Sequence, residues 1–241
     1  MVTFVLVHGA WHGSWCWKRV RTALQARGHD VHTPTLTGVG ERSHLVSPQI
    51  NLETHIDDIV NLMKWEDLAD VVLCGHSYAG AVISGVADRI PERISALVYL
   101  DAFVLEDGQS VHDTLPPTHR ALQLDLAQKL GDGWKVPPIP AEVFNVNAAD
   151  RAWVDSQCTM HPLATFQQPL TLKAGPHAPI NTTFILTTGF HDSPFPPSYD
   201  RARVKGWATA TIDCGHDVML DRPEELTSIL AAIAAAEPAA S

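Results

Sequence analysis

The sequence predicts an α/β fold with a mostly parallel sheet flanked by helices. Apolar runs of strand length recur along the chain, and amphipathic segments with helical spacing separate most of them. The predicted strands span residues 3–7, 30–33, 71–74, 96–100, 183–187 and 208–212. The alternation breaks between about Leu105 and Ile180, where Pro, His, Gln and Trp become frequent. This break indicates an insertion into an otherwise regular fold.

Two amphipathic helices are predicted to pack on the sheet in its N-terminal half. The first carries Trp17, Val20 and Leu24 at helical spacing and ends at Gly28. The second precedes the third strand, and Asn51 is placed to cap its N-terminus.

A further helix is predicted over residues 222–235, after the last strand. Asp221 and Glu224 form a D-x-x-E capping pattern, and Pro223 lies in the first turn. Because the segment is rich in Ala, Leu and Ile, we expect it to close one face of the sheet.

The inserted segment, residues 105–180, is predicted to form a small helical cap after the strand that ends near Leu100. The core is then made of residues 1–104 and 181–241. An independent second domain is the competing interpretation. A segment of this length without a clear core pattern favours an insertion instead.

The composition restricts the classes of partner. Of the 241 residues, 45% are apolar and 18% are charged, which is typical of an ordinary globular protein. The formal net charge is −10, and Lys and Arg do not cluster. Nucleic acid and anionic membrane are therefore disfavoured as partners, and a small neutral ester-like substrate fits better. A homodimer is compatible with the sequence.

Neither a membrane span nor a metal site is expected. No run approaches the roughly 18 apolar residues of a membrane helix, and a secretory signal is not recognisable, so a cytoplasmic location is predicted. The four cysteines are far apart without a CxxC pair, which predicts neither a disulfide framework nor a zinc site. His8 and His12 are spaced by four residues, but across a strand end and a Gly-rich loop.

A serine lies in a turn of small residues directly after the third predicted strand, in the segment GHSYAG, residues 75–80. A strand that reverses into a helix while presenting a serine needs very small residues two positions before and two after it. Gly75 and Ala79 occupy those positions, and Ala79 departs mildly from the usual glycine. Ser77 is therefore the candidate nucleophile.

A serine nucleophile needs a histidine base and a carboxylate that orients the histidine. His216 follows the last predicted strand, at the edge of a parallel sheet where chemistry is usually located. Asp192 follows the strand at 183–187 and is the preferred acid. Asp101, at the end of the neighbouring strand, is the alternative acid.

Two other carboxylates are less favoured as the acid. Asp200 falls in a predicted helix, and Asp213 lies too close to His216 along the chain to face it. For the oxyanion of a tetrahedral intermediate, two backbone N–H donors are expected, from Tyr78 and from Ala10 in the loop after the first strand.

These residues resemble the α/β-hydrolase superfamily, and within it the branch of hydroxynitrile lyases, plant methylesterases and bacterial esterases such as pyrethroid hydrolases. The similarity extends over nearly the whole chain. It is carried by the opening FVLVHGAWHG with the following WCW, by TLTGVGER at residues 35–42, and by VYLDAF at residues 98–103. The resemblance implies a triad of Ser77, Asp192 and His216, oxyanion donors at Ala10 and Tyr78, a small helical cap and no cofactor.

Two departures from the branch favour hydrolysis over lyase chemistry. The lyases carry a lysine after the catalytic histidine and a threonine after the first-loop histidine, whereas this chain has Asp217 and Gly9. An anion beside the histidine cannot stabilise departing cyanide. Dehalogenases and epoxide hydrolases of this fold use an aspartate nucleophile, so Ser77 excludes their mechanism.

The predicted function is therefore that of a carboxylesterase-type serine hydrolase. It would cleave a carboxylic ester, carbamate or lactone of a small, largely apolar substrate through an acyl-enzyme intermediate. The residues proposed to line an apolar pocket are Trp11, Phe103, Trp134, Trp153 and Leu163. A C–C lyase of the hydroxynitrile lyase type and a hydrolase-like ligand receptor are the alternatives.

Overall fold

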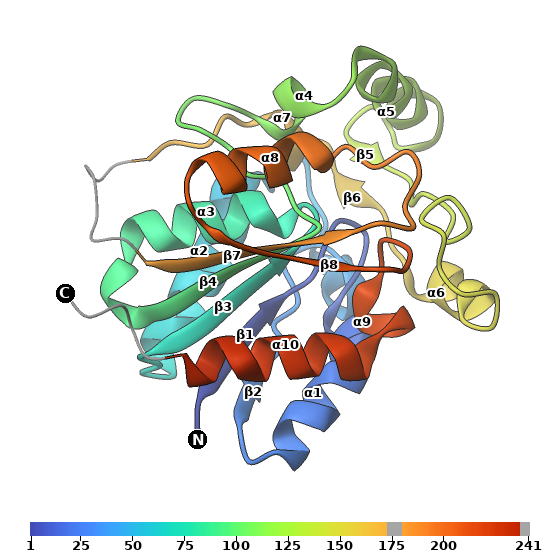
Figure 1. Cartoon of the computed structure of the whole chain (residues 1–241). Helices are drawn as coiled ribbons and strands as arrows, with labels where there is room; N and C mark the ends of the chain where they lie inside the picture. The colour runs from blue at the N-terminus through green and yellow to red at the C-terminus, as the bar shows by residue number, and fades with distance from the viewer. Residues whose placement is uncertain (173–179, 237–241) are drawn as a thin grey trace.

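A six-stranded parallel sheet forms the centre of the molecule (Figure 1). The computed structural model describes residues 1–172 and 180–236 of the chain. The strands lie in the order β2-β1-β3-β4-β7-β8. Their bounds are β1 Thr3–Val7, β2 Asp30–His32, β3 Val71–His76, β4 Ile94–Leu100, β7 Asn181–Thr187 and β8 Ala208–Ile212. The predicted fold class, a mostly parallel sheet flanked by helices, is confirmed.

Helices cover both faces of this sheet. In Figure 1, α1 and α10 lie together below the strands, while α2, α3 and α8 lie on the opposite face. Their bounds are α1 Lys18–Ala26, α2 Leu52–Trp65, α3 Ala79–Arg89, α8 Pro196–Val204 and α10 Pro223–Ala235, with the short α9, Val218–Asp221, before the last. Single 3₁₀ turns occupy Ser14–Trp17, Gly40–Leu45 and Pro91–Arg93. Because both faces are covered, the inner strands are continuous apolar runs rather than alternating ones.

The predicted caps of α2 and α10 have different outcomes. Asn51 caps α2, accepting a hydrogen bond from the Thr54 amide in a complete capping box. Asp221 does not cap α10, because its carboxylate instead accepts hydrogen bonds from the amide and the side chain of Asn147. The helix begins at Pro223, whose missing N–H needs no partner. Asp221 thus connects the core to the inserted segment.

Between Leu100 and Asn181, no described residue joins the main sheet. The elements here are α4 Val111–Thr114, α5 Pro117–Leu130, β5 Lys135–Val136, α6 Arg151–Gln157, β6 His161–Pro162 and α7 Ala164–Gln167. The antiparallel pair β5–β6 was not predicted, because two-residue strands leave no apolar pattern. Residues 173–179 of the predicted cap lie outside the described residues. The cap boundaries, 105 and 180, stay a prediction.

At the start of α3, Gly80 rather than Ala79 is the position that has no room for a side chain. A Cβ atom at Gly80 would lie 2.1 Å from the carbonyl oxygen of Phe103, well inside van der Waals contact. Ala79 is fully buried, so its methyl group is accommodated in the core. The absence of glycine at position 79 therefore does not distort the turn after Ser77.

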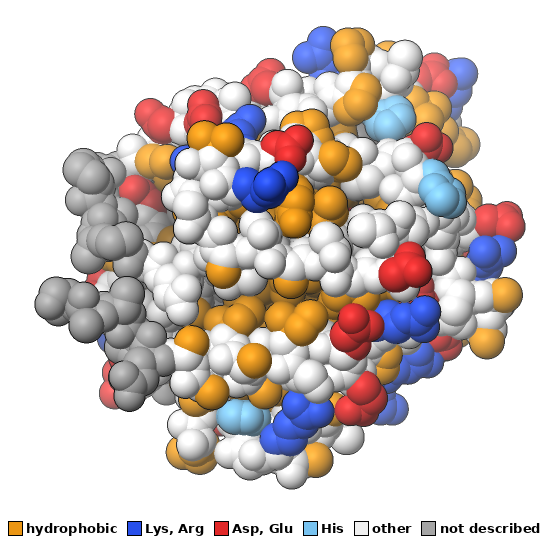
Figure 2. All heavy atoms as spheres, viewed as in Figure 1, with side chains coloured by type: hydrophobic (Ala, Val, Ile, Leu, Met, Phe, Trp, Pro, Cys, Tyr) orange, Lys and Arg blue, Asp and Glu red, His pale blue; other side chains and the backbone are white. Residues whose placement is uncertain are grey.

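Among the helices of residues 1–172 and 180–236, none is long and apolar enough to cross a membrane. On the face seen in Figure 2, acidic and basic side chains are interspersed rather than segregated. Hydrophobic side chains are exposed in furrows between them.

Candidate active site

Ser77 lies on a strained turn between β3 and α3. Its φ is 55°, in the left-handed region that disfavours non-glycine residues. Two backbone hydrogen bonds hold it there, because the Ser77 amide donates to Leu100 O at 3.1 Å and Ser77 O accepts from the Phe103 amide at 3.1 Å. Ser77 is partly exposed while its immediate neighbours are buried. This is the geometry of a nucleophile elbow.

Strained backbone also occurs where β1 and β3 end, at the carboxyl edge of the sheet. Among the described non-glycine residues with positive φ, all are Asp or Asn except Trp11 and Ser77. Asp and Asn tolerate this conformation, whereas for Trp and Ser it costs about 1–3 kcal/mol. Both strained residues follow the ends of strands, Trp11 after β1 and Ser77 after β3. Strain of this kind persists where the surrounding structure enforces it, typically at functional sites.

Asp101, not Asp192, is the carboxylate that contacts His216. The distance from His216 Nδ1 to Asp101 Oδ2 is 2.6 Å, and both side chains are almost completely buried. Because a carboxylate only accepts, His216 must carry its proton on Nδ1, which leaves Nε2 free to accept one. Asp101 has a φ of 43° directly after β4.

Thr187 anchors the Asp101 carboxylate from the neighbouring strand. Its amide donates to Asp101 Oδ1 at 3.1 Å, and its hydroxyl donates to Oδ2 at 2.9 Å. Together with His216, three donors surround a carboxylate that is 0% exposed. The carboxylate is therefore fixed in position before any substrate binds.

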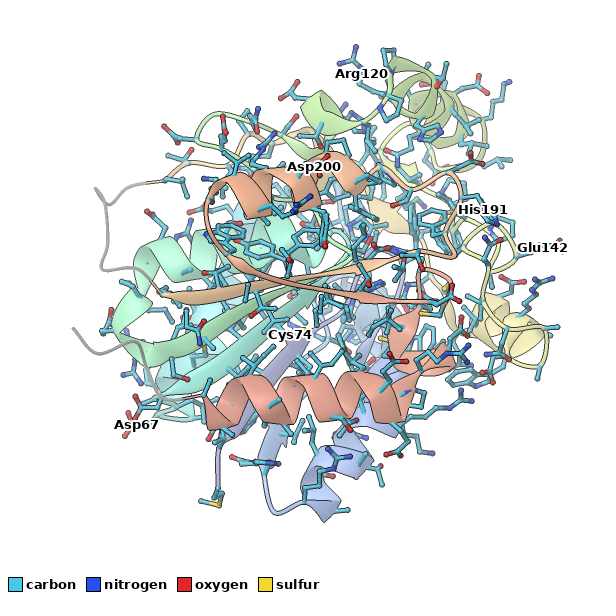
Figure 3. All side chains as sticks on the ribbon, viewed as in Figure 1. Asp67, Cys74, Arg120, Glu142, His191 and Asp200 are labelled. Atoms are coloured by element: carbon cyan, nitrogen blue, oxygen red, sulfur yellow. The ribbon has the colours of Figure 1, made fainter. Side chains whose placement is uncertain are left out.

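The expectation that Asp192 orients His216 is corrected by this geometry. Asp192 lies five positions beyond the end of β7, on an exposed loop, and its side chain makes no hydrogen bond or ion pair within the described residues. It lines the cavity described below. Asp213 accepts a hydrogen bond from Thr188, and Asp200 lies on α8 with its side chain exposed (Figure 3). Asp101 reaches His216 because β4 lies directly between β3 and β7.

Aromatic rings and backbone contacts fix His216. Its amide donates to Phe144 O at 2.9 Å, and the ring of Phe195 stacks on it at 5.2 Å between centroids. His76 donates from Nε2 to His216 O at 3.0 Å, with the two rings 4.4 Å apart. His216 and Ser77 line the same cavity.

Two backbone N–H groups beside Ser77 are available for an anion. Ala10 and Tyr78 both line the cavity and are buried, and neither amide donates a turn or loop hydrogen bond within the described residues. The loop that carries Ala10 lies against the elbow, since a Cβ atom on Gly9 would be 3.0 Å from Ser77 Cβ. A glycine is needed for this close approach.

The inserted segment holds the residue next to Ala10. Trp11 donates from its amide to His161 Nδ1 at 3.3 Å and from Nε1 to Val136 O at 3.1 Å. Its carbonyl accepts from the Thr159 amide at 3.0 Å. These partners all lie between α5 and α7, so the strained backbone at Trp11 is enforced from outside the core sheet.

The cavity measures about 470 Å³ and is mostly apolar. Of the pocket residues predicted from the sequence, Trp11 and Phe103 line it, whereas Trp134, Trp153 and Leu163 are not among its lining residues. Trp153 packs edge-on against Trp15 at 5.1 Å. Leu163 is buried elsewhere, its amide donating to Trp134 O at 2.8 Å.

Most of the cavity wall was missed from the sequence. It comes from the apolar face of α5, a proline-rich stretch after β5, and aromatic rings, namely Leu115, Leu122, Leu126, Leu130, Pro137, Pro138, Ile139, Pro140, Val143, Phe144, Phe166, Phe190 and Phe195. Leu122 and Leu130 remain 55% and 62% exposed although they face the cavity. Leucines spaced by four residues without a core partner are the signal that could have identified this wall.

Comparisons with known proteins agree with this fold. The family model described as "Alpha/beta hydrolase family" matches residues 4–229. The chain belongs to the α/β-hydrolase family. A carbendazim hydrolyzing esterase of Nocardioides sp. (strain SG-4G) is 46% identical over 246 residues, covering 97% of this chain and 100% of the relative.

Two further matches confirm the resemblance drawn from the sequence. Methylesterase 2 of Arabidopsis thaliana is 36% identical over 109 residues, 44% of this chain and 41% of that protein. The solved structure of an extracellular α/β-hydrolase from a Paenibacillus species matches with a TM-score of 0.84 and 24% identity. It covers 97% of this chain and 99% of that chain, and it supports the fold.

In this α/β-hydrolase, Asp217 does not reach the cavity. It is 0% exposed, absent from the cavity lining, and its Oδ2 lies 3.1 Å from His12 Nε2. The Asp217 carboxylate therefore faces His12 rather than the cavity. Within the described residues, no group of three or more His, Cys, Asp or Glu side chains is arranged to hold a metal ion.

Proposed function

We propose that this chain is a serine hydrolase that cleaves a carboxylic ester or an ester-like carbamate or lactone through an acyl-enzyme intermediate. The observation that carries the proposal is the 2.6 Å contact between His216 and Asp101, with His216 and Ser77 lining one cavity. The named activity of the Nocardioides relative, an esterase, supports the same reaction class.

In the first half of the reaction, Ser77 Oγ attacks the carbonyl carbon while His216 Nε2 takes the hydroxyl proton. Asp101 keeps the other proton on Nδ1 and stabilises the imidazolium. The N–H groups of Ala10 and Tyr78 receive the negative charge on the carbonyl oxygen. His216 then gives its proton to the oxygen of the leaving alcohol, and the acyl or carbamoyl group stays on Ser77.

In the second half, His216 removes a proton from water, which attacks the acyl carbon. The tetrahedral intermediate uses the same two N–H donors, and its collapse returns the proton from His216 to Ser77. The acid leaves as a carboxylate, or as a carbamic acid when the substrate is a carbamate.

The cavity favours a neutral, largely apolar substrate. Its described lining contains no Lys or Arg, and its polar members apart from Ser77 and His216 include Gln123, His119 and Asp192. An anionic substrate would meet no counter-charge there. The lack of a lining cation likewise favours hydrolysis over release of cyanide.

The free Cys16, Cys74, Cys158 and Cys214 support a reducing, cytoplasmic location.

The test is a panel of p-nitrophenyl esters, aryl carbamates and lactones assayed on the native protein and on Ser77→Ala. We expect Ser77→Ala to lower kcat at least about 10⁴-fold on every substrate that turns over. Ser228→Ala, an exposed serine on α10, is the control and should retain full activity. A Ser77→Ala variant with native turnover would contradict the mechanism, and single-turnover hydrolysis would favour a ligand receptor.

Thr187→Val tests how Asp101 is held. The substitution removes the hydroxyl that donates to Oδ2 and leaves the backbone donor in place. We expect kcat to fall about 10-fold or more, since loss of one hydrogen bond to a charged group is worth about 1.5 kcal/mol or more. Thr188→Val is the matched control, because its hydroxyl contacts the exposed Asp213. Equal kcat values for the two variants would show that Thr187 does not position Asp101.

A further inference from the structure

We propose that His12 and Asp217 form a buried ion pair that positions the oxyanion donor Ala10 relative to His216. Both are positioning residues and touch neither substrate nor reacting atoms. The inference rests on the proposed function and deepens it, because a buried pair of charges outside the cavity lining would then align the oxyanion site.

The hydrogen bonds of His12 require it to be a cation. His12 Nδ1 lies 2.7 Å from Ala10 O, and Nε2 lies 3.1 Å from Asp217 Oδ2. Both partners are acceptors, so both ring nitrogens must donate. His12 is 2% exposed and Asp217 is 0% exposed, so no solvent replaces either contact.

The charges of the pair support each other. Burial alone would lower the pKa of His12, but the charge of Asp217 and its hydrogen bond raise that pKa above its usual value. Burial alone would raise the pKa of Asp217, but His12 lowers it. Asp217 Oδ1 is buried without a hydrogen-bond partner among the described residues, so His12 supplies the principal compensation. Removing one charge leaves the other buried and unpaired.

The pair connects the two loops that must act together. Asp217 follows His216 directly, and His12 lies two residues after Ala10. The linkage therefore runs from Ala10 O through His12 to Asp217 and along the backbone to His216. The ring of Trp15 stacks on His12 at 5.0 Å and limits its rotation. Loss of either charge should thus move the Ala10 N–H relative to the His216 ring.

Asp217→Asn keeps the shape of the side chain and removes its charge. His12 then loses a proton, its Nε2 accepts a hydrogen bond from the new amide nitrogen, and its Nδ1 donates to Ala10 O without the help of a positive charge. The weaker hold on Ala10 should lower kcat about 10-fold, because an oxyanion donor is worth about 10²- to 10³-fold when lost completely. KM should change less than about 3-fold, since neither His12 nor Asp217 lines the cavity.

The experiment measures two rates on the same proteins, hydrolysis of p-nitrophenyl butyrate and covalent labelling of Ser77 by a fluorophosphonate. Labelling displaces fluoride from phosphorus and needs the anion site, but it needs no particular natural substrate. Native protein that labels yet hydrolyses no ester would defeat the proposed function. The labelling ratio of native protein to Asp217→Asn would still test this inference.

Three controls keep the test decisive. His12→Gln retains a donor toward Asp217, and His12→Asn retains a donor toward Ala10 O. Each variant lacks the other donor, so both should slow labelling. Arg89→Gln removes the ion pairs that Arg89, a mostly buried arginine at the far end of α3, makes with Glu53 and the exposed Asp57. It should lower Tm and leave the labelling rate unchanged.

The inference is overturned by a native labelling rate in folded Asp217→Asn or in His12→Gln. It is also overturned if Arg89→Gln slows labelling to the same extent, because the effect would then report general destabilisation. Nitrogen-15 NMR supplies a separate readout, in which His12 should carry protons on both ring nitrogens at pH 7. A single protonated nitrogen would contradict the ion pair.

Discussion

Asp101→Asn should lower kcat about 10⁴-fold and leave KM nearly unchanged. The amide can donate to His216 Nδ1, which would move the ring proton to Nε2 and remove the base. It also loses the charge that stabilises the imidazolium formed when Ser77 attacks. The contact replaced is the shortest hydrogen bond of His216, 2.6 Å to a fully buried oxygen. Ester hydrolysis under saturating substrate measures the effect.

Asp192→Asn is the matched control for this prediction. It makes the same change to an exposed carboxylate on the cavity wall, and we expect kcat to remain within about 3-fold of native. Circular dichroism of both variants checks that each is folded. A large loss of kcat in Asp192→Asn with native activity in Asp101→Asn would contradict the assignment of Asp101.

Acidification from pH 7 to pH 5 should remove much of the folding stability. Burial lowers the pKa of His8 to about 3 and that of His55 to about 4, and it holds the pKa values of His76 and His161 well below the usual 6.5. The folded state therefore keeps these rings neutral while the unfolded chain takes up protons. Each ring contributes stability above pH 6.5 that is lost as pH falls, and for His8 and His55 the loss is about 2 kcal/mol each by pH 5.

His8 and His55 together correspond to about 4 kcal/mol, a large part of the total stability of an average domain, and His76 and His161 act in the same direction. His12 acts in the opposite direction, because its raised pKa gives stability that is present below pH 6.5 and lost at higher pH. Urea unfolding at pH 7, 6 and 5 measures the change in the free energy of unfolding. A value that does not change across this range would show that the buried rings are not neutral in the folded protein.

The sequence was most informative where local rules act alone. Each predicted strand formed, the inner strands as apolar runs buried from both faces and the edge strands β2 and β8 with partly exposed residues. Asn51 caps its helix through contacts within four residues. Ser77 was identifiable because a nucleophile elbow constrains the residues beside it along the chain. His216 was identifiable because it follows the last strand of an alternating pattern.

The cavity wall and the actual partner of Asp221 were not predictable by these rules. The wall combines α5, the residues after β5 and the loop after β7, which meet only in the folded molecule. Asp221 matched a capping pattern, yet Asn147 from the inserted segment competes successfully for its carboxylate. Long-range partners outweigh local propensity when they offer stronger or additional hydrogen bonds.

The sequence by itself determined the fold class, the nucleophile candidate and the histidine candidate. Only the tertiary structure decided which carboxylate meets His216. Asp101 and Asp192 both follow strands, and sequence position does not reveal the order in which strands lie. Because β4 lies between β3 and β7, Asp101, the residue directly after β4, is next to Ser77 and within reach of His216. Strand adjacency, rather than distance along the chain, selects the acid.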